Sequence, residues 1–324
     1  MDLKSLKNIV QSELDLLESR LKVRSKTSVS LINKLGEHII QSGGKRLRPL
    51  VVILASKLKT NSPCDQVIDA AVIIEFIHAA TLLHDDVVDM SVMRHSQDTA
   101  NTIWGNKGAV LVGDFLYSRA FEIIVEINDE RIYETLAHTT NTIAQGEVMQ
   151  LMNIENTKLS EKEYMEIIYR KTAILFEASA KIGGIVSDYN DHEIDSLSKY
   201  GYHFGIAYQL RNDYLDYFGS RSLTGKNLAE DLSEGKVTLP IIHALGKCSE
   251  SDRAVIEKAI VDYNSGNQSE LIINILKSCE SDIYLQTKID EQTDLAVSYA
   301  KCFSENEYRE TLIALAEVCR CRES

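Results

Sequence analysis

The stretch Leu82-Leu83-His84-Asp85-Asp86-Val87-Val88-Asp89 places three carboxylates at the end of a long apolar run that starts near Ile68. If the run is a helix, Asp85 and Asp89 lie four positions apart and share a face, while Asp86 points elsewhere. Two carboxylates on an otherwise apolar surface repel each other and lose hydration, which is costly unless a cation lies between them. The sequence therefore predicts a cation site at the end of a buried helix.

Mg²⁺ is the cation that this pattern favours, because it is held by one or two carboxylates together with substrate phosphates and water. The alternative is a solvated acidic helix end. The residues around the carboxylates argue against that alternative, since they are too apolar for a solvated face: Ile73, Ile74, Phe76, Ile77, Leu82, Leu83, Val87 and Val88.

The overall charge limits the classes of partner. The chain has 324 residues and a formal net charge of −13, which argues against non-specific binding to nucleic acid or to an anionic membrane. Basic spots such as Lys45-Arg46-Leu47-Arg48 and Arg170-Lys171 are therefore candidate anion sites.

The cysteines and the N-terminus indicate a compartment. The cysteines form no C-x-x-C pair and no metal-ligand spacing with histidine, so we expect reduced thiols: they are Cys64, Cys248, Cys279, Cys302, Cys319 and Cys321. The first ten residues carry charges throughout, unlike a signal peptide. The run from Ile68 to Leu83 is interrupted by charged residues and indicates a core helix, with no transmembrane segment. We expect a cytoplasmic protein.

Apolar residues recur at three- and four-residue spacing along almost the whole chain, and alternating strand-like runs are scarce. The sequence has three prolines and no linker, repeat or change in composition. It predicts an all-α protein with one domain over residues 1–324. The expected helices cover residues 2–23, 28–42, 48–59, 63–90, 107–127, 130–153, 161–186, 191–218, 236–247, 251–263, 268–279, 283–303 and 306–320.

A basic loop, Gly43-Gly44-Lys45-Arg46-Leu47-Arg48-Pro49, precedes one of these helices. Free backbone N–H groups and the helix dipole at such a point suit a diphosphate. The alternative is a basic loop that only caps the helix. Arg94 and His95 follow the acidic cluster closely, where cations would hold the phosphate oxygens that a metal does not reach. His78 lies on the apolar helix and, taken by itself, is most simply a core histidine.

A second group of signals lies further along the chain. Lys171-Thr172 lies within the apolar helix expected at 161–186. The stretch Gln209–Gly219 repeats the acidic spacing, with Asn212 in the first place and Asp213 in the second. Gly225-Lys226 and Glu230–Lys236 follow in a loop. Two such clusters with several basic spots, in an acidic chain, indicate a cavity for two diphosphates bridged by Mg²⁺.

In their order along the chain these motifs resemble the trans-polyprenyl diphosphate synthases, and most closely the octaprenyl-forming type of bacteria. The resemblance rests on the D-D-x-x-D at Asp85–Asp89, the G-G-K-R-x-R-P at Gly43–Pro49, the K-T at Lys171-Thr172 and the E-G-K-x-T-L-P at Glu234–Pro240. It implies a single large helical bundle of the isoprenoid synthase type with a central active-site cavity. It also implies Mg²⁺ as the cofactor and, usually, a homodimer.

The resemblance implies a role for each matching residue. Asp85 and Asp89 would bind the Mg²⁺ ions on the allylic diphosphate, and Asn212 with Asp213 would belong to the second metal cluster. The allylic diphosphate itself would be held by Arg94, Lys171, Thr172, Gln209 and Lys226. Isopentenyl diphosphate would be held by Lys45, Arg48 and His78, with His95 in a further place for that substrate. Lys171 and Lys226 would be catalytic together with the two aspartates, because they draw charge from the departing diphosphate.

The implied reaction is head-to-tail chain elongation. The allylic diphosphate ionises, the double bond of isopentenyl diphosphate attacks the cation, and a proton is lost to the departing diphosphate. An open tunnel for a long product is predicted by the small residues before the acidic cluster, Ala80 and Thr81, and by Ile77 deeper in the same helix. The best estimate of the product is eight isoprene units. Such a product would serve a quinone such as ubiquinone. The alternative is that Ala80 only permits close helix packing.

This sequence departs from the family pattern at His95, Asn212 and Ala229-Glu230, where the family has Arg, Asp and Gly-Asp. All three positions concern the diphosphates or their metals. They leave open a second function, a non-catalytic or regulatory subunit of a heteromeric synthase. A terpene cyclase or head-to-head condensing enzyme is a third possibility, but it needs no pocket for isopentenyl diphosphate.

Overall fold

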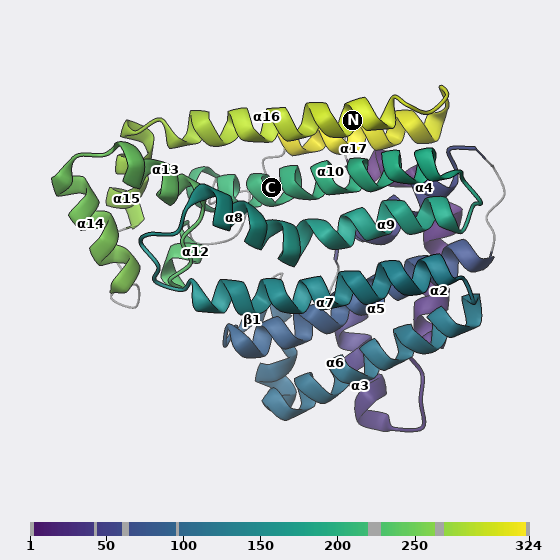
Figure 1. Cartoon of the computed structure of the whole chain (residues 1–324). Coiled ribbons are helices and arrows are strands. Elements are labelled where there is room, and N and C mark those ends of the chain that lie inside the picture. The colour runs from purple at the N-terminus through teal and green to yellow at the C-terminus, as the bar shows by residue number, and fades with distance from the viewer. Residues whose placement is uncertain are drawn as a thin grey trace. The chain divides into compact units, whose positions relative to one another are not determined.

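A computed structural model describes residues 3–41, 44–59, 65–94, 97–219, 228–262 and 269–321. These residues are almost entirely helical, as predicted (Figure 1). The elements are α1 (Leu3–Asn8), α2 (Gln11–Arg24), α3 (Ser30–Gln41), α4 (Leu47–Ser56), α5 (Asp65–Val88), β1 (Met93–Arg94), β2 (Gln97–Asp98), α6 (Ala100–Ile127), α7 (Glu130–Met152), α8 (Glu161–Ile168), η1 (Tyr169–Ala173), α9 (Ile174–Ile185), α10 (Asp191–Phe218), α12 (Glu230–Ser233), α13 (Leu239–Lys247), α14 (Glu250–Val261), α15 (Ser269–Ser278), α16 (Ser281–Ala300) and α17 (Glu307–Cys321).

The chain divides into two compact units. Unit 1 contains residues 1–140, 175–201 and 300–314, and unit 2 contains residues 141–174, 202–299 and 315–324. The acidic cluster and the basic loop belong to unit 1, and the K-T motif and the second cluster belong to unit 2. The prediction of one domain over the whole chain stays a prediction.

Helix α5 is the core of unit 1. It packs against α2, α4 and α6, and it lies alongside α6 (Figure 1). Its side chains are buried on every side from Val67 to Leu83, as expected for a helix that is apolar all round. Among the described helices, α5 is the one long and apolar enough to cross a membrane. In its most apolar stretch of 18 residues, 72% is buried within the protein. Such burial is what a core helix shows.

The helix predicted at 161–186 is wrong in its middle. Residues Tyr169–Ala173 form one turn of π-helix between α8 and α9. A π turn contains one residue more than an α turn, and two neighbouring helices approach it closely. A Cβ atom at Gly146 of α7 would lie 2.8 Å from the backbone nitrogen of Lys171, and one at Gly205 of α10 would lie 2.6 Å from Cα of Ala173. Two glycines of unit 2 therefore let the widened turn fit between α7 and α10.

Three smaller expectations also failed. The helix predicted at 2–23 is broken between Asn8 and Gln11. Helix α6 begins at Ala100 with a short segment that was not predicted; the helix predicted at 107–127 follows a break at Gly105, whose φ of 78° departs from helical geometry. The β1–β2 pair and α12 were not predicted, since segments of two to four residues are too short to show a period.

Other local signals are confirmed. Helix α10 has the predicted bounds. At the start of α8 the Ser160 side chain accepts a hydrogen bond from the Glu163 N–H, and the Glu163 carboxylate accepts one from the Ser160 N–H at 2.9 Å. This is the reciprocal capping box that the spacing predicted. In unit 2 the short helices α13, α14 and α15 pack together (Figure 1).

Candidate active site

The acidic cluster lies at the C-terminal end of α5. Asp85 and Asp89 are half-buried, whereas the side chain of Asp86 is only 1% exposed. Helix α5 ends at Val88, and the Asp89 N–H donates to the Asp85 carbonyl oxygen at 2.8 Å. The expected division therefore holds: Asp85 and Asp89 are accessible and Asp86 points into the protein.

Asp86 has a structural partner in Arg94. Nε and Nη2 of Arg94 both donate to one Asp86 oxygen, at 2.9 and 2.8 Å. The Asn101 side chain donates to the Asp86 carbonyl oxygen at 3.1 Å. This arrangement fixes strand β1 and the start of α6 to the end of α5. Arg94, predicted to hold diphosphate, is thus held beside the cluster by Asp86, and His95 lies outside the described residues.

Arg46 fixes the basic loop, a role that the sequence did not indicate. Its backbone is left-handed, with φ of 50°, at the start of α4. Its guanidinium pairs with Glu18 at 2.7 Å and with Glu75, and it donates to the Ile40 carbonyl oxygen. Burial lowers the pKa of Arg46, but Glu75 and Glu18 outweigh it and raise that pKa above its ordinary value. Arg46 is therefore fully engaged within unit 1, while Lys45 beside it is exposed.

Arg48 and His78, both predicted for isopentenyl diphosphate, are brought together in unit 1. Nη1 of Arg48 lies 3.1 Å from Nε2 of His78. Because a guanidinium can only donate, Nε2 of His78 accepts, and the neutral imidazole carries its proton on Nδ1. The Arg48 guanidinium also lies 4.4 Å from the centre of the Phe176 ring. His78 is therefore more than a packed core histidine, since it orients an arginine.

The residues predicted to line a product tunnel lie on either side of His78 on α5. Ala80 and Ile77 are fully buried, and Thr81 is half-buried, with its hydroxyl donating to the His78 carbonyl oxygen at 2.7 Å. The tunnel itself stays a prediction.

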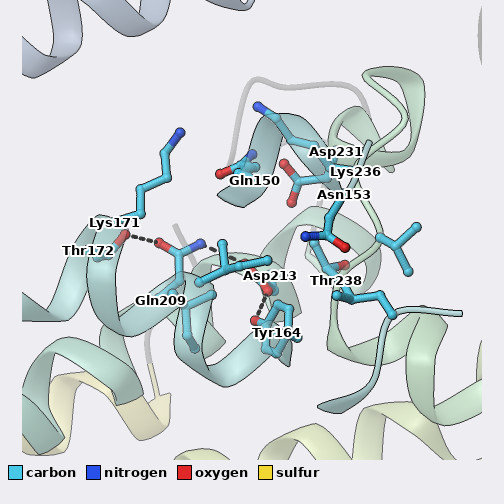
Figure 2. A pocket seen from close by; sticks show the side chains of 14 residues that line it. Gln150, Asn153, Tyr164, Lys171, Thr172, Gln209, Asp213, Asp231, Lys236 and Thr238 are labelled. Carbon is cyan, nitrogen blue, oxygen red and sulfur yellow. Dashed lines mark hydrogen bonds between the residues drawn. The ribbon is translucent and has the colours of Figure 1, made fainter. Parts of the chain in front are cut away.

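Unit 2 contains a cavity of about 150 Å³ that collects the other predicted polar residues (Figure 2). Its lining includes Lys171, Thr172, Gln209 and Asp213, all predicted. Three further polar lining residues belong to stretches that the sequence singled out without giving them individual roles: Asp231, Lys236 and Thr238. The sequence did not predict the others, which are Gln150, Asn153 and Tyr164. Lys226 lies outside the described residues.

A chain of hydrogen bonds runs along one wall of this cavity (Figure 2). The Thr172 hydroxyl donates to Oε1 of Gln209 at 3.1 Å, and Nε2 of Gln209 donates to Oδ1 of Asp213 at 2.8 Å. The Tyr164 hydroxyl donates to the other oxygen of Asp213. Lys171, next to Thr172 in the π turn, lies with its Nζ 2.6 Å from a Glu147 oxygen. The widened turn thus gives adjacent residues two different partners on two different helices.

Three carboxylates lie close together near this wall. Burial, and then the neighbouring Asp231 carboxylate, raise the pKa values of Asp213 and Asp216 to about 8. The Asp216 carboxylate accepts the backbone N–H of Glu230 at 3.0 Å and of Asp231 at 3.3 Å, at the start of α12. Burial and mutual repulsion therefore both favour the protonated form of these carboxyl groups.

The donors present fit a metal that substrate helps to hold. Among the described residues no three His, Cys, Asp or Glu side chains converge as a complete metal cage. Asp85 and Asp89 provide two accessible carboxylates, which is the protein share of a Mg²⁺ site completed by diphosphate oxygens and water. Asn212 lies half-buried on α10 in unit 2 and carries an uncharged amide oxygen.

Comparisons with known proteins agree with this arrangement. The chain is 38% identical to octaprenyl diphosphate synthase of Escherichia coli over 318 residues, 98% of each protein. It is 35% identical to the geranyl-diphosphate-specific all-trans-nonaprenyl-diphosphate synthase of Rhodobacter capsulatus, over 90% of this chain and 89% of that protein. The crystal structure of polyprenyl synthase from Caulobacter crescentus, with calcium and isoprenyl diphosphate, is 35% identical with a TM-score of 0.94, covering 100% of this chain and 98% of that one.

The similarity to solved polyprenyl synthases over the whole chain identifies the architecture as the all-α isoprenoid synthase fold. The sequence model of the Polyprenyl synthetase family matches residues 29–278, which include the D-D-x-x-D cluster, the basic loop and the K-T motif. The chain belongs to the polyprenyl synthetase family.

Proposed function

We propose that this protein is a prenyltransferase that condenses isopentenyl diphosphate head-to-tail onto an allylic diphosphate and releases a long-chain all-trans polyprenyl diphosphate. The observation that carries the proposal is the cavity of unit 2, where Lys171, Thr172 and Gln209 line one wall together. A cation, a hydroxyl and an amide side by side are suited to the oxygens of a diphosphate. Similarity to octaprenyl diphosphate synthase over almost the full chain supports the same reaction.

Each group has a role in the proposed reaction. Lys171 and Gln209 bind and orient the allylic diphosphate and stabilise the charge that develops as its C–O bond breaks. Arg48, held by His78, binds isopentenyl diphosphate in unit 1 and leaves its double bond as the nucleophile. The proton lost afterwards passes to the departing diphosphate, so no side-chain nucleophile is required.

We also propose Mg²⁺ as the cofactor, bound by Asp85 and Asp89, with Asn212 for a further ion. When bound, Mg²⁺ supplies positive charge that makes diphosphate a better leaving group. The relative from Caulobacter crescentus was crystallised with another oxygen-preferring divalent cation, calcium, which supports this assignment. Lys226 and His95 are proposed as further diphosphate contacts from the family resemblance.

An octaprenyl product is the best estimate of chain length. The small side chains at Ala80 and Thr81, and aliphatic Ile77 deeper on α5, support a long product. The similar enzymes from Escherichia coli and Rhodobacter capsulatus are described as octaprenyl and nonaprenyl synthases. A product of this length suits the side chain of a quinone such as ubiquinone.

We propose a cytoplasmic homodimer. Helix α6 supports the dimer, because four large apolar side chains lie within roughly 100° of each other around its axis. They are exposed to between 38% and 68%: Val110, Leu111, Phe121 and Val125. A second copy could cover this face. Sedimentation of the wild type and of Leu111→Glu tests it, since the charged variant should be monomeric if α6 forms the interface.

Incubation of the purified chain with labelled isopentenyl diphosphate, a short allylic diphosphate and Mg²⁺, followed by sizing of the products, tests the function. Elongation by the chain alone excludes a purely regulatory role, which the changes at His95, Asn212 and Ala229-Glu230 would otherwise permit. No elongation with any allylic primer would contradict the proposal.

A further inference from the structure

Asp213 on α10 is almost completely enclosed. Its residue is 1% exposed, and both of its carboxylate oxygens accept hydrogen bonds within unit 2. One comes from the hydroxyl of Tyr164 on α8, itself 3% exposed, and the other from Nε2 of Gln209, one helical turn earlier. A carboxylate with both oxygens engaged by buried neighbours is suited to anchoring those neighbours.

This anchor determines which way the Gln209 amide faces. Nε2 of Gln209 donates to Oδ1 of Asp213, so the amide presents its NH₂ group to this carboxyl. Its carbonyl oxygen then faces Thr172, and the 3.1 Å contact shows the Thr172 hydroxyl donating to it. One N–H of the amide is used by Asp213, and the second N–H is left for the cavity that Gln209 lines.

An amide rotated by half a turn would do the opposite. It would place its carbonyl oxygen against Oδ1 of Asp213, which accepts a hydrogen bond in the structure, and it would remove a donor from the cavity wall. The difference matters for an anionic ligand, because the oxygens of a diphosphate only accept hydrogen bonds at neutral pH. Figure 2 shows Gln209 lying between Thr172 and Asp213, with Tyr164 on the far side of Asp213.

We propose that Tyr164 is a positioning residue for the allylic substrate: through Asp213 it fixes the Gln209 amide with a donor toward the diphosphate. The proposal rests on the proposed function. It gives Asp213 a role different from the metal ligand that the family resemblance implies, since the anchor uses both oxygens. It also explains a tyrosine at 164, because its hydroxyl donates to the second oxygen of Asp213 at this buried point.

The test is Tyr164→Phe, which removes the hydroxyl and keeps the ring. We expect the KM for the allylic diphosphate, and the Kd of a non-ionising allylic thiolodiphosphate measured by calorimetry, to rise about five- to tenfold together. The KM for isopentenyl diphosphate and the Mg²⁺ concentration for half-maximal rate should change less than twofold. Tyr200→Phe is the matched control: its buried hydroxyl donates to the Leu312 carbonyl oxygen at 2.8 Å in unit 1. That variant should lose stability but keep the wild-type KM values for both substrates, the Kd of the allylic analogue and the Mg²⁺ requirement.

A double variant shows whether Tyr164 acts through Gln209. If it does, Gln209→Ala should weaken allylic binding by itself, and adding Tyr164→Phe should weaken it less than twofold further. Full multiplication of the two effects would overturn the proposal, as would an unchanged allylic constant in Tyr164→Phe.

If Tyr164→Phe does not fold, Asp213→Asn provides the test. We expect a weakened allylic constant with an unchanged Mg²⁺ requirement. A Mg²⁺ requirement raised tenfold would show that Asp213 is a metal ligand and would overturn the anchor. An inactive wild type would contradict the proposed function, whereas an active wild type with unaffected variants would contradict only the positioning role.

Discussion

Nζ of Lys171 lies 2.6 Å from a carboxylate oxygen of Glu147, so the K-T lysine is held by a glutamate on α7. Both side chains are partly exposed, at 22% and 29%. Lysine has three N–H donors, and this ion pair engages one of them. Glu147 therefore orients the ammonium group of Lys171.

We expect Glu147→Ala to lower kcat/KM for the allylic substrate about tenfold, because a charge-assisted hydrogen bond contributes about 1.5–3 kcal/mol. Glu147→Gln keeps an acceptor and should stay within about threefold of the wild type. Glu166→Ala is a matched control, since it breaks the ion pair of Arg170, at 2.7 Å, next to Lys171. Equal losses in Glu147→Ala and Glu166→Ala would mean that Glu147 acts only on local stability.

The three aspartates of the first cluster should separate into two classes. Asp85→Ala or Asp89→Ala should lower the turnover rate more than about tenfold. The metal-free variant should be as stable as the wild type or slightly more stable, because the repulsion between the two carboxylates is removed. Asp86→Ala should lower the free energy of unfolding by about 1–3 kcal/mol, because it removes the buried partner of Arg94.

Steady-state kinetics and urea denaturation in EDTA measure the two effects. An Asp85→Ala or Asp89→Ala variant that retains more than about a tenth of the rate would contradict the metal assignment.

Ala80→Tyr should shorten the product. Ala80 lies about one helical turn, or roughly 6–8 Å, before Asp85, and it is fully buried. A tyrosine ring in the tunnel would stop elongation at about three or four isoprene units while early steps keep near-normal rates, and chromatography of the products measures this. Ala79→Tyr, one position earlier and also buried, tests whether overpacking alone has this effect. An unchanged product length in a folded Ala80→Tyr protein would place the tunnel elsewhere.

The buried pair Glu13–Lys57 should control stability at acid pH. Burial alone would raise the pKa of the Glu13 carboxyl, but hydrogen bonds from Lys57 and Ser12 outweigh it and lower that pKa below its ordinary value of 4.5. A lowered folded pKa contributes stability that is present above 4.5 and is lost as the pH falls through the folded value. The free energy of unfolding should therefore fall as the pH drops below 4.5.

Glu13→Gln should lower the free energy of unfolding at pH 7 by about 3–5 kcal/mol, because it leaves Lys57 buried without its charged partner, and it should flatten the acid slope. The double variant Glu13→Leu/Lys57→Met should recover most of the loss. Denaturation at several pH values checks both. A slope in Glu13→Gln equal to that of the wild type would assign the acid dependence to other groups.

The sequence predicted the helices well where apolar residues repeat over several turns, as in α5 and α10. It could not predict the π turn at Tyr169–Ala173. That turn packs against Gly146 and Gly205, which are far from it in sequence and leave space for it in neighbouring helices. A single sequence does not show which distant glycine faces which turn.

The same reasoning explains the outcome at the site. The K-T motif and Gln209 were predicted because their residue types and order match a known pattern, and they line one cavity. Tyr164 was not predicted, because a tyrosine at a helical core position looks like ordinary packing until its hydroxyl is seen on Asp213. Arg46 was counted among the anion-binding charges, but its partners Glu18 and Glu75 are distant in sequence.

The ion pairs of Arg46 also show that the boundary of a family match can separate residues that contact each other in the structure. The family match begins at residue 29, after α2 has ended. Glu18 of α2 nevertheless grips Arg46 at 2.7 Å, and Arg46 lies between Lys45 and Arg48 in the loop proposed to hold isopentenyl diphosphate. A truncation at residue 29 would keep every family motif but should weaken the binding of isopentenyl diphosphate. The N-terminal helix α2, although outside the family match, therefore supports the binding loop.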